Sequence, residues 1–186
     1  MKRAWRVLSN ILFVAIIVIL IVPSWRVQFQ GWFQSIFMGT ESFEKNTAQP
    51  LPTDVREWEI MKVEGLSQRF SSFKGKPIVI SFWATWCPPC LAELKSLKSL
   101  KSNLANQAYF ISVSEESEAT ITQSGLHEDY DFLYNTKRFP SFFQVDLYPT
   151  LCIIDGSGTM IYRHEGAGAI DTEKNVAFIR ELVENG

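Results

Sequence analysis

Residues 78–90 read IVISFWATWCPPC, and this stretch decides the fold. It begins as an apolar, β-branched run, which is typical of a strand buried on both faces. After it, leucines recur every three or four residues and lysines lie between them, which predicts an amphipathic helix. The leucines are Leu91, Leu94, Leu97, Leu100 and Leu104, and the lysines are Lys95, Lys98 and Lys101. Cys87 and Cys90 are therefore expected where a central strand turns into a helix.

This position favours redox chemistry at Cys87. The unpaired N–H groups and the positive dipole end of a helix N-terminus stabilise a thiolate relative to a thiol. A lowered pKa makes Cys87 a good nucleophile and leaving group, and Cys90, one turn later, can resolve the mixed disulfide. Pro88 and Pro89 have no N–H and fix two φ angles, so the turn between the cysteines is expected to be stiff.

Two alternatives exist for the cysteine pair, namely two buried core cysteines or half of a zinc site. A structural zinc site needs four ligands, and the sequence holds neither a second cysteine pair nor a close histidine pair. The pattern therefore favours a redox pair that needs no metal and no bound cofactor. The third cysteine, Cys152, lies within an apolar strand pattern and is expected to be a small buried side chain.

Length and composition indicate one domain with a short additional segment. The chain has 186 residues, of which 46% are hydrophobic and 13% aromatic, which suits a compact core. The formal net charge of −2 gives no reason to expect nucleic acid as a partner.

The N-terminal residues 1–24 are predicted to form one transmembrane helix. Residues 11–22 are an unbroken apolar run, and Val7 and Leu8 extend it backwards to a core of about sixteen residues, slightly short for a bilayer. Lys2, Arg3 and Arg6 precede it. This charge distribution keeps the N-terminus in the cytoplasm and places the rest of the chain outside. A cleaved secretory signal has an apolar region of similar length, although no Ala-x-Ala pattern follows this one. Both interpretations export the remaining chain.

Residues 25–54 are expected to connect this anchor to the domain, residues 55–186. Aromatic and apolar residues at helical spacing within 27–38 fit an amphipathic helix on the outer membrane surface. The alternative is a hydrophobic linker that packs on the anchor or on a neighbouring protein. Residues 41–54 contain asparagine, threonine and two prolines and are expected to be a tether.

The rest of the domain is predicted to alternate strands and helices, which fits an α/β sandwich. Edge strands are expected within 58–70, a second central strand at 108–113, a short helix at 119–125 and a short strand at 132–134. Strands at 151–154 and 159–164 are expected to form a hairpin around the turn at 155–158. A final helix at about 171–183 is expected to place Val176, Ile179 and Val183 on one face.

The string FWATWCPPC, with KGKP before it and Glu93 after it, resembles the thioredoxin fold. Within that fold it is similar to the membrane-anchored TlpA/ResA-type thiol–disulfide oxidoreductases of bacteria, from about Trp58 to the C-terminus. The resemblance implies a central mixed β-sheet flanked by helices and a redox-active Cys87–Cys90 disulfide. It also implies a single-pass protein of the bacterial inner (cytoplasmic) membrane, with its C-terminal domain on the periplasmic or outer side.

The resemblance implies further site residues. Tyr148–Pro149 would be the cis-proline turn that faces the cysteines, where the backbone of Tyr148 can pair with an extended substrate strand. ResA-like members carry a glutamate at the place of Glu93, near the thiols. Thioredoxins have a buried aspartate where this chain has Ser81, so Glu93 is the candidate that accepts the proton of Cys90. On spacing alone, an exposed helix carboxylate is equally compatible with Glu93.

A substrate surface is expected around the cysteines. Trp86 is expected to form the apolar part of this surface, together with Pro88, Pro89, Tyr148 and Pro149.

The leading hypothesis is a membrane-tethered thiol–disulfide oxidoreductase that reduces exported proteins. By resemblance, electrons come from a transmembrane thiol carrier, and substrates in the group include the Cys-x-x-Cys-His of apocytochromes c. A disulfide-forming oxidase would run the same chemistry backwards. A copper-delivery protein of the Sco type would space its cysteines by three and need a ligating histidine. A non-catalytic envelope binding module remains a further alternative, although both cysteines are intact.

Overall fold

The structure is a computed structural model of the chain. It describes Trp5, residues 9–11, Phe13 and residues 39–185. Most of the predicted anchor at 1–24, and all of the aromatic segment at 25–38, therefore lie outside the described residues. Among the helices in the described part of the chain, none is both long enough and apolar enough to cross a bilayer.

The centre of the fold is a mixed sheet of eight strands in the order β1-β8-β7-β4-β5-β6-β2-β3. Strand β4 lies in the middle, parallel to β5 and antiparallel to β7, and all its residues are buried, as the apolar run predicts. The strands are β1 (Gln49–Pro50), β2 (Glu59–Lys62), β3 (Ser67–Arg69), β4 (Ile78–Phe82), β5 (Tyr109–Ser114), β6 (Leu133–Asn135), β7 (Thr150–Ile154) and β8 (Thr159–Glu165).

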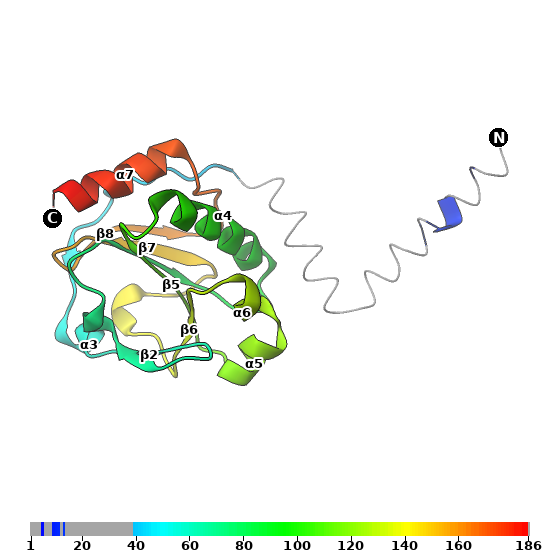
Figure 1. The fold of residues 1–186 in the computed structure, drawn as a ribbon, viewed down its shortest axis with the longest axis horizontal. Coiled ribbons are helices and arrows are strands. Elements are labelled where there is room, and N and C mark those ends of the chain that lie inside the picture. The colour runs from blue at the N-terminus through cyan, green and yellow to red at the C-terminus, as the bar shows by residue number, and fades with distance from the viewer. Residues whose placement is uncertain (1–4, 6–8, 12, 14–38, 186) are drawn as a thin grey trace.

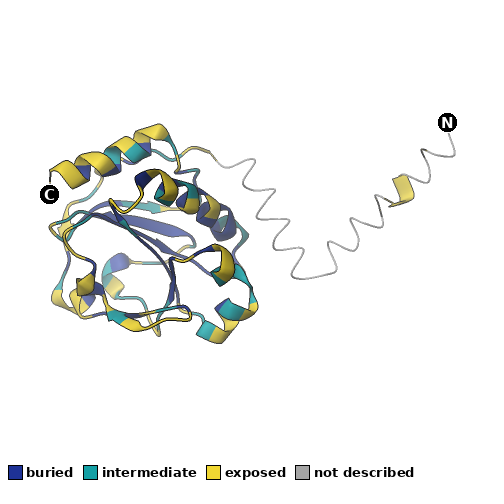
Figure 2. Ribbon diagram, in the orientation of Figure 1, coloured by how far each residue is buried: buried dark blue, intermediate teal, exposed yellow. Residues whose placement is uncertain are grey.

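Two long helices, α4 and α7, lie side by side over one face of this sheet (Figure 1). All five leucines of the predicted stripe in α4 are buried against the sheet, while Lys95 and Lys98 are exposed. Figure 2 shows buried and exposed positions following one another along this helix. The second face carries another core, in which the rings of Trp58, Phe70 and Phe143 pack against one another. The helices are α3 (Thr53–Arg56), α4 (Pro88–Leu104), α5 (Glu118–Gln123), α6 (Leu126–Asp129) and α7 (Glu173–Glu184), with single 3-10 turns at Phe70–Ser72 and Ser141–Phe143. The predicted α/β architecture with a mixed sheet is confirmed.

The segment predicted as a tether, residues 41–54, packs on the domain instead. The side chain of Asn175 in α7 accepts a hydrogen bond from the Phe43 backbone N–H and donates one to the Glu41 carbonyl, each at 2.8 Å. Phe43 is only 1% exposed, and β1 extends the sheet by pairing with β8. The polar composition of the segment concealed these buried positions. The domain therefore begins near residue 40, and the predicted boundary at residue 55 is too late.

Helix α6 lies between the predicted helix at 119–125 and the predicted strand at 132–134, where the sequence analysis expected no element. The prediction for the last helix also needs correction. In α7 the buried residues are Asn175, Ile179 and Leu182, whereas Val183 is 39% exposed. Val183 was predicted to be buried because it is hydrophobic. The face of α7 that packs on the domain is instead the one that contains Asn175, Ile179 and Leu182.

Candidate active site

The two motif cysteines lie at the turn between β4 and α4, where they form a disulfide with their Cα atoms 5.3 Å apart. Cys87 is the N-cap residue of α4, and its Sγ accepts the backbone N–H of Cys90 at 3.3 Å. The two residues between them are prolines, which have no N–H to donate. Within this turn the helix therefore offers the Cys87 sulfur a single hydrogen bond.

Both cysteines are buried in the disulfide form. Cys87 is 4% exposed and Cys90 is 1% exposed, so the two cysteines differ little in exposure in this form. Trp86, directly before Cys87, is 62% exposed. Pro88 and Pro89 are half-buried beside it. A substrate that reaches Cys87 must therefore contact these neighbours.

The predicted cis-proline turn lies next to this site. The Tyr148–Pro149 peptide bond is cis, as expected, and it directly precedes β7. Thr150, the first residue of β7, pairs in register with Phe82 at the end of β4, which brings the turn to the cysteine end of the sheet. The rings of Trp86 and Tyr148 meet edge to face, with centroids 5.7 Å apart. The structure thus gathers the predicted contact residues at one place.

Glu93 is completely enclosed between α4 and the sheet. It is 1% exposed, and the hydroxyl of Ser81 in β4 donates a hydrogen bond of 2.7 Å to its Oε1. Burial raises the pKa of Glu93 to about 7, although the hydrogen bond from Ser81 acts in the opposite direction. The alternative of an exposed helix carboxylate is therefore wrong. A carboxyl group that titrates near neutral pH is suited to accept and release protons.

Glu116 is a site residue that the sequence analysis missed. It follows β5, and its carboxylate accepts hydrogen bonds from the backbone N–H of Thr85 at 2.6 Å and from the Thr85 hydroxyl at 2.7 Å. Thr85 lies two residues before Cys87, so Glu116 holds the loop that presents Trp86 and the disulfide. Because the two partners are 31 positions apart, no local pattern pointed to this contact.

The third cysteine takes no part in the site. Cys152 in β7 is fully buried, as predicted, and burial raises its thiol pKa to about 12. The thiol therefore stays protonated at neutral pH, and a protonated, enclosed thiol does not exchange with disulfides.

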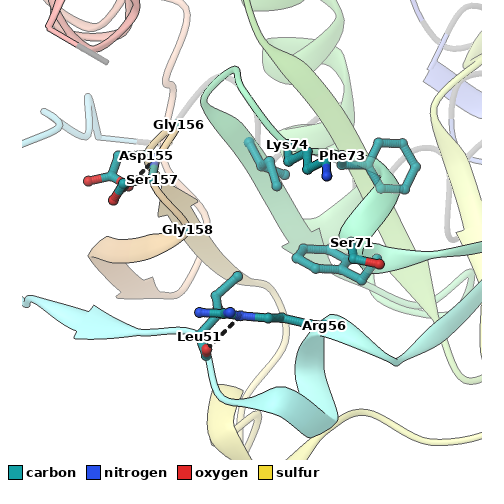
Figure 3. Close-up of a pocket in the computed structure, with 11 residues that line it drawn as sticks. Leu51, Arg56, Ser71, Phe73, Lys74, Asp155, Gly156, Ser157 and Gly158 are labelled. Atoms are coloured by element: carbon teal, nitrogen blue, oxygen red, sulfur yellow. Dashed lines mark hydrogen bonds between the residues drawn. The ribbon is translucent and has the colours of Figure 1, made fainter.

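A cavity of about 170 Å³ lies away from the cysteines, at the start of β4 (Figure 3). Leu51, Phe70 and Phe73 form its apolar wall, and Arg56 lies across it with its Nε donating to the Leu51 carbonyl at 3.1 Å. Because β4 runs from this cavity to the disulfide, the two features are at opposite ends of the central strand and do not form one site.

Comparison with known proteins finds relatives among the redoxins, thioredoxin-like proteins and thiol-disulfide oxidoreductases. Residues 48–177 match the Redoxin family model. The chain is 28% identical over 116 residues to the thioredoxin-like protein YneN of Bacillus subtilis, covering 59% of this chain and 68% of that protein. It is 24% identical over 155 residues to the thiol-disulfide oxidoreductase ResA of Bacillus cereus, covering 81% and 86%.

A solved structure agrees with these matches. The pneumococcal exposed lipoprotein thioredoxin of Streptococcus pneumoniae superimposes with a TM-score of 0.52 at 27% identity, covering 68% of this chain and 98% of that one. The family match spans more than half of the chain and includes the cysteine turn, Glu93 and the cis-proline turn. The chain therefore belongs to the redoxin family and is a thioredoxin-like thiol–disulfide oxidoreductase of the TlpA/ResA type.

Proposed function

We propose that this protein is a membrane-tethered reductase of disulfides in exported proteins. The reduced Cys87 thiolate attacks a substrate disulfide, which forms a mixed disulfide and releases one substrate thiolate. Cys90 then loses its proton and attacks the Cys87 sulfur, which releases the second substrate thiolate and forms the Cys87–Cys90 disulfide. Two electrons pass to the substrate, and a transmembrane thiol carrier returns the domain to the reduced state.

The single observation that carries the reducing direction is the sparse stabilisation of the Cys87 sulfur. A domain becomes a strong oxidant when its reduced, thiolate form is stabilised. Here two of the N–H groups that a helix N-terminus would offer are absent at Pro88 and Pro89, and only Cys90 donates to Cys87. The ionised carboxylate of Glu93 on the same helix opposes a second negative charge nearby. Both effects favour the disulfide over the dithiol, so the dithiol gives up electrons readily.

Glu93 is the proposed proton acceptor for Cys90. It lies three residues after Cys90, one turn along α4, and it is the buried carboxyl group of this core layer. With a pKa of about 7, a substantial fraction of Glu93 is ionised at neutral pH and can take the thiol proton.

The exposed ring of Trp86 and the half-buried ring of Tyr148 are the proposed docking surface beside the disulfide. Trp86 and Tyr148 would cover the apolar part of a substrate next to its cysteine, while Pro88 and Pro89 shape the rim. The backbone of Tyr148 before the cis bond to Pro149 would pair with an extended substrate segment.

The tether and the cellular setting rest on the N-terminal sequence and the resemblance. Residues 1–24 would anchor the protein in the lipid of the bacterial inner membrane, with the domain on the periplasmic or outer side. There it would meet exported thiol proteins, among which the Cys-x-x-Cys-His segments of apocytochromes c are the proposed substrates in cytochrome c maturation.

The midpoint potential of the Cys87–Cys90 pair tests the direction. The full chain in detergent is equilibrated with defined ratios of reduced and oxidised dithiothreitol or glutathione, and the free thiols are alkylated and counted. A reductase is expected to have a potential close to that of thioredoxin, about −270 mV, whereas a potent oxidase lies near −120 mV. A value at the oxidising end would assign the protein to disulfide formation instead.

A further inference from the structure

Two serines lie side by side beneath helix α4. Ser81 in β4 and Ser112 in β5 are partners in register on adjacent parallel strands. Side chains of such partners point to the same face of the sheet. The hydroxyl of Ser81 reaches Glu93 on α4, so Ser112 also faces the layer that contains Glu93. Both serines are 1% exposed.

Hydrogen bonding in this layer is incomplete. Glu93 Oε1 is bonded to Ser81, but Glu93 Oε2 and Ser112 Oγ are both buried and have no hydrogen-bond partner among the described residues. Buried polar atoms without a partner are rare in folded proteins. Here Glu93 Oε2 is an acceptor on α4, and Ser112 Oγ is a hydroxyl that can donate from the strand next to that of Ser81.

The protonation state of Glu93 decides how many donors it needs. An ionised carboxylate accepts at both oxygens, whereas the neutral acid carries the proton on one of them. A single donor leaves the buried ionised form costly, because an unpaired buried charge loses its hydration without replacement. A second donor is therefore required in the state in which Glu93 acts as a base.

We propose that Ser112 is a positioning residue for Glu93, and that its hydroxyl donates the second hydrogen bond to the carboxylate when Glu93 is ionised. The hydroxyl reaches Oε2 by rotation about the Cα–Cβ bond of Ser112 or across one water molecule. Ser81 and Ser112 then hold one oxygen each, which fixes the orientation of the carboxylate between α4 and the sheet. The importance of this hydrogen bond for catalysis rests on the proposed role of Glu93 in proton transfer. The existence of the hydrogen bond does not depend on that role.

Other charged groups near Glu93 must be accounted for. The pKa of Tyr162 in β8 is raised mainly by burial, and the negative charge of Glu93 adds to this increase. The Tyr162 hydroxyl donates a hydrogen bond of 2.7 Å to Glu41, in the segment before β1. On α4 itself, Cys87 and Cys90 carry no charge while they are joined as a disulfide. A titration in the disulfide form therefore leaves Tyr162 and Glu41 as the neighbours to be kept constant, and both are unchanged in the variants below.

The experiment follows the side-chain carboxyl 13C signal of Glu93 against pH in the full chain, in detergent and in the disulfide form. Glu93→Gln identifies the signal by its loss. Ser112→Ala should raise the midpoint by about one pH unit, because the ionised form loses a donor. Ser112→Thr, which keeps the hydroxyl, should titrate like the parent. Ser96→Ala is the matched control. Ser96 is buried on α4, the helix that carries Glu93, but its hydroxyl donates a hydrogen bond to Asp171 and not to Glu93.

Two results would overturn the proposal. One is an unchanged Glu93 midpoint in Ser112→Ala while Ser81→Ala shifts it, which would leave Ser81 as the only partner. The other is an equal shift in Ser112→Ala and Ser112→Thr, which would indicate packing rather than a hydrogen bond. Thermal unfolding of each variant checks that the domain stays folded. A different measurement tests the proton-transfer role: an unchanged resolving rate in Glu93→Gln would contradict it. Failure of the Ser112 proposal and failure of the proposed role of Glu93 can therefore be told apart.

Discussion

The hydroxyl of Ser81 on the central strand donates a hydrogen bond of 2.7 Å to the Glu93 carboxylate on helix α4. In thioredoxins, by the resemblance, the buried carboxylate comes from the strand position that Ser81 occupies here. In this chain the helix supplies the carboxylate, and the strand supplies its hydrogen-bond donor. A buried acid is thereby kept within one helical turn of Cys90, although its position in the sequence differs.

The cysteines are expected to respond differently to replacement by serine. Cys87→Ser should abolish turnover, because Cys87 at the N-cap receives the N–H of Cys90 and forms the attacking thiolate. Cys90→Ser should instead accumulate a mixed disulfide between Cys87 and the substrate, detectable by mass spectrometry of the intact protein. Cys152→Ser serves as the control and should keep full activity, since its thiol is enclosed and protonated. Faster alkylation of Cys90 than of Cys87 at neutral pH would reverse the assignment of the two roles.

Glu93→Gln should lower the pKa of at least one motif thiol and slow the resolving step. The amide removes a negative charge near the thiols, which makes the thiolate less costly, but it cannot accept the Cys90 proton. Thiolate absorbance titration and single-turnover reduction of a model disulfide measure the two effects. The resolving rate is expected to fall by about a hundredfold, the low end of the range for loss of a general base. Unchanged titration and rate would show that the proton goes directly to water.

Glu93 should also make folding stability depend on pH. Its pKa is about 7 in the folded protein against 4.5 for an unperturbed glutamate, so the folded state binds its proton more tightly. The free energy of unfolding should therefore fall as pH rises through this window, by up to about 3 kcal/mol, and this loss should be absent in Glu93→Gln.

Urea unfolding of the disulfide forms at several pH values provides the comparison. The carboxyl groups of Glu44 and Asp131, whose pKa values are lowered by hydrogen bonds from Lys174 and Lys101, act in the opposite sense at lower pH. Both are present in the parent and in the variant, so they cancel in the difference. A difference between parent and Glu93→Gln that is constant from pH 4.5 to 7 would contradict the assignment of a raised pKa to Glu93.

Glu116→Ala should loosen the loop that carries Trp86. The substitution removes the acceptor of two hydrogen bonds from Thr85, one of which is from the backbone. We expect a loss of about 2 kcal/mol in the free energy of unfolding. KM for a protein disulfide should rise more than kcat falls, because the ring of Trp86, part of the proposed docking surface, loses its position. Glu118→Gln, at the start of helix α5 and two residues after Glu116, is the control and should change neither KM nor kcat. Equal kinetics in the two variants would mean that the loop holds its position without Glu116.

The N-terminal prediction is tested by topology. A reporter fused after the C-terminus should be active outside the cytoplasm, and the protein should stay in the membrane fraction after alkaline washing. A soluble envelope protein with a new N-terminus near Trp25 would instead identify residues 1–24 as a cleaved signal.

Local patterns determined much of this protein. The buried strand at 78–82, the leucine stripe of α4 and the hairpin around 155–158 follow from periodicity and turn residues, which act over a few positions. The cysteine pair at the strand–helix turn follows from the same patterns. These features could be predicted because each one is encoded by neighbours in the chain.

Only the tertiary structure decided the environment of individual polar groups. The spacing of Glu93 was compatible with solvent, but the packing of α4 on β4 buries it against Ser81. The contact of Glu116 with Thr85, and the docking of Phe43 through Asn175, join residues that are far apart in the chain. Burial and hydrogen bonding depend on which surfaces meet when the sheet and helices assemble, and the local pattern of a polar residue does not contain that information.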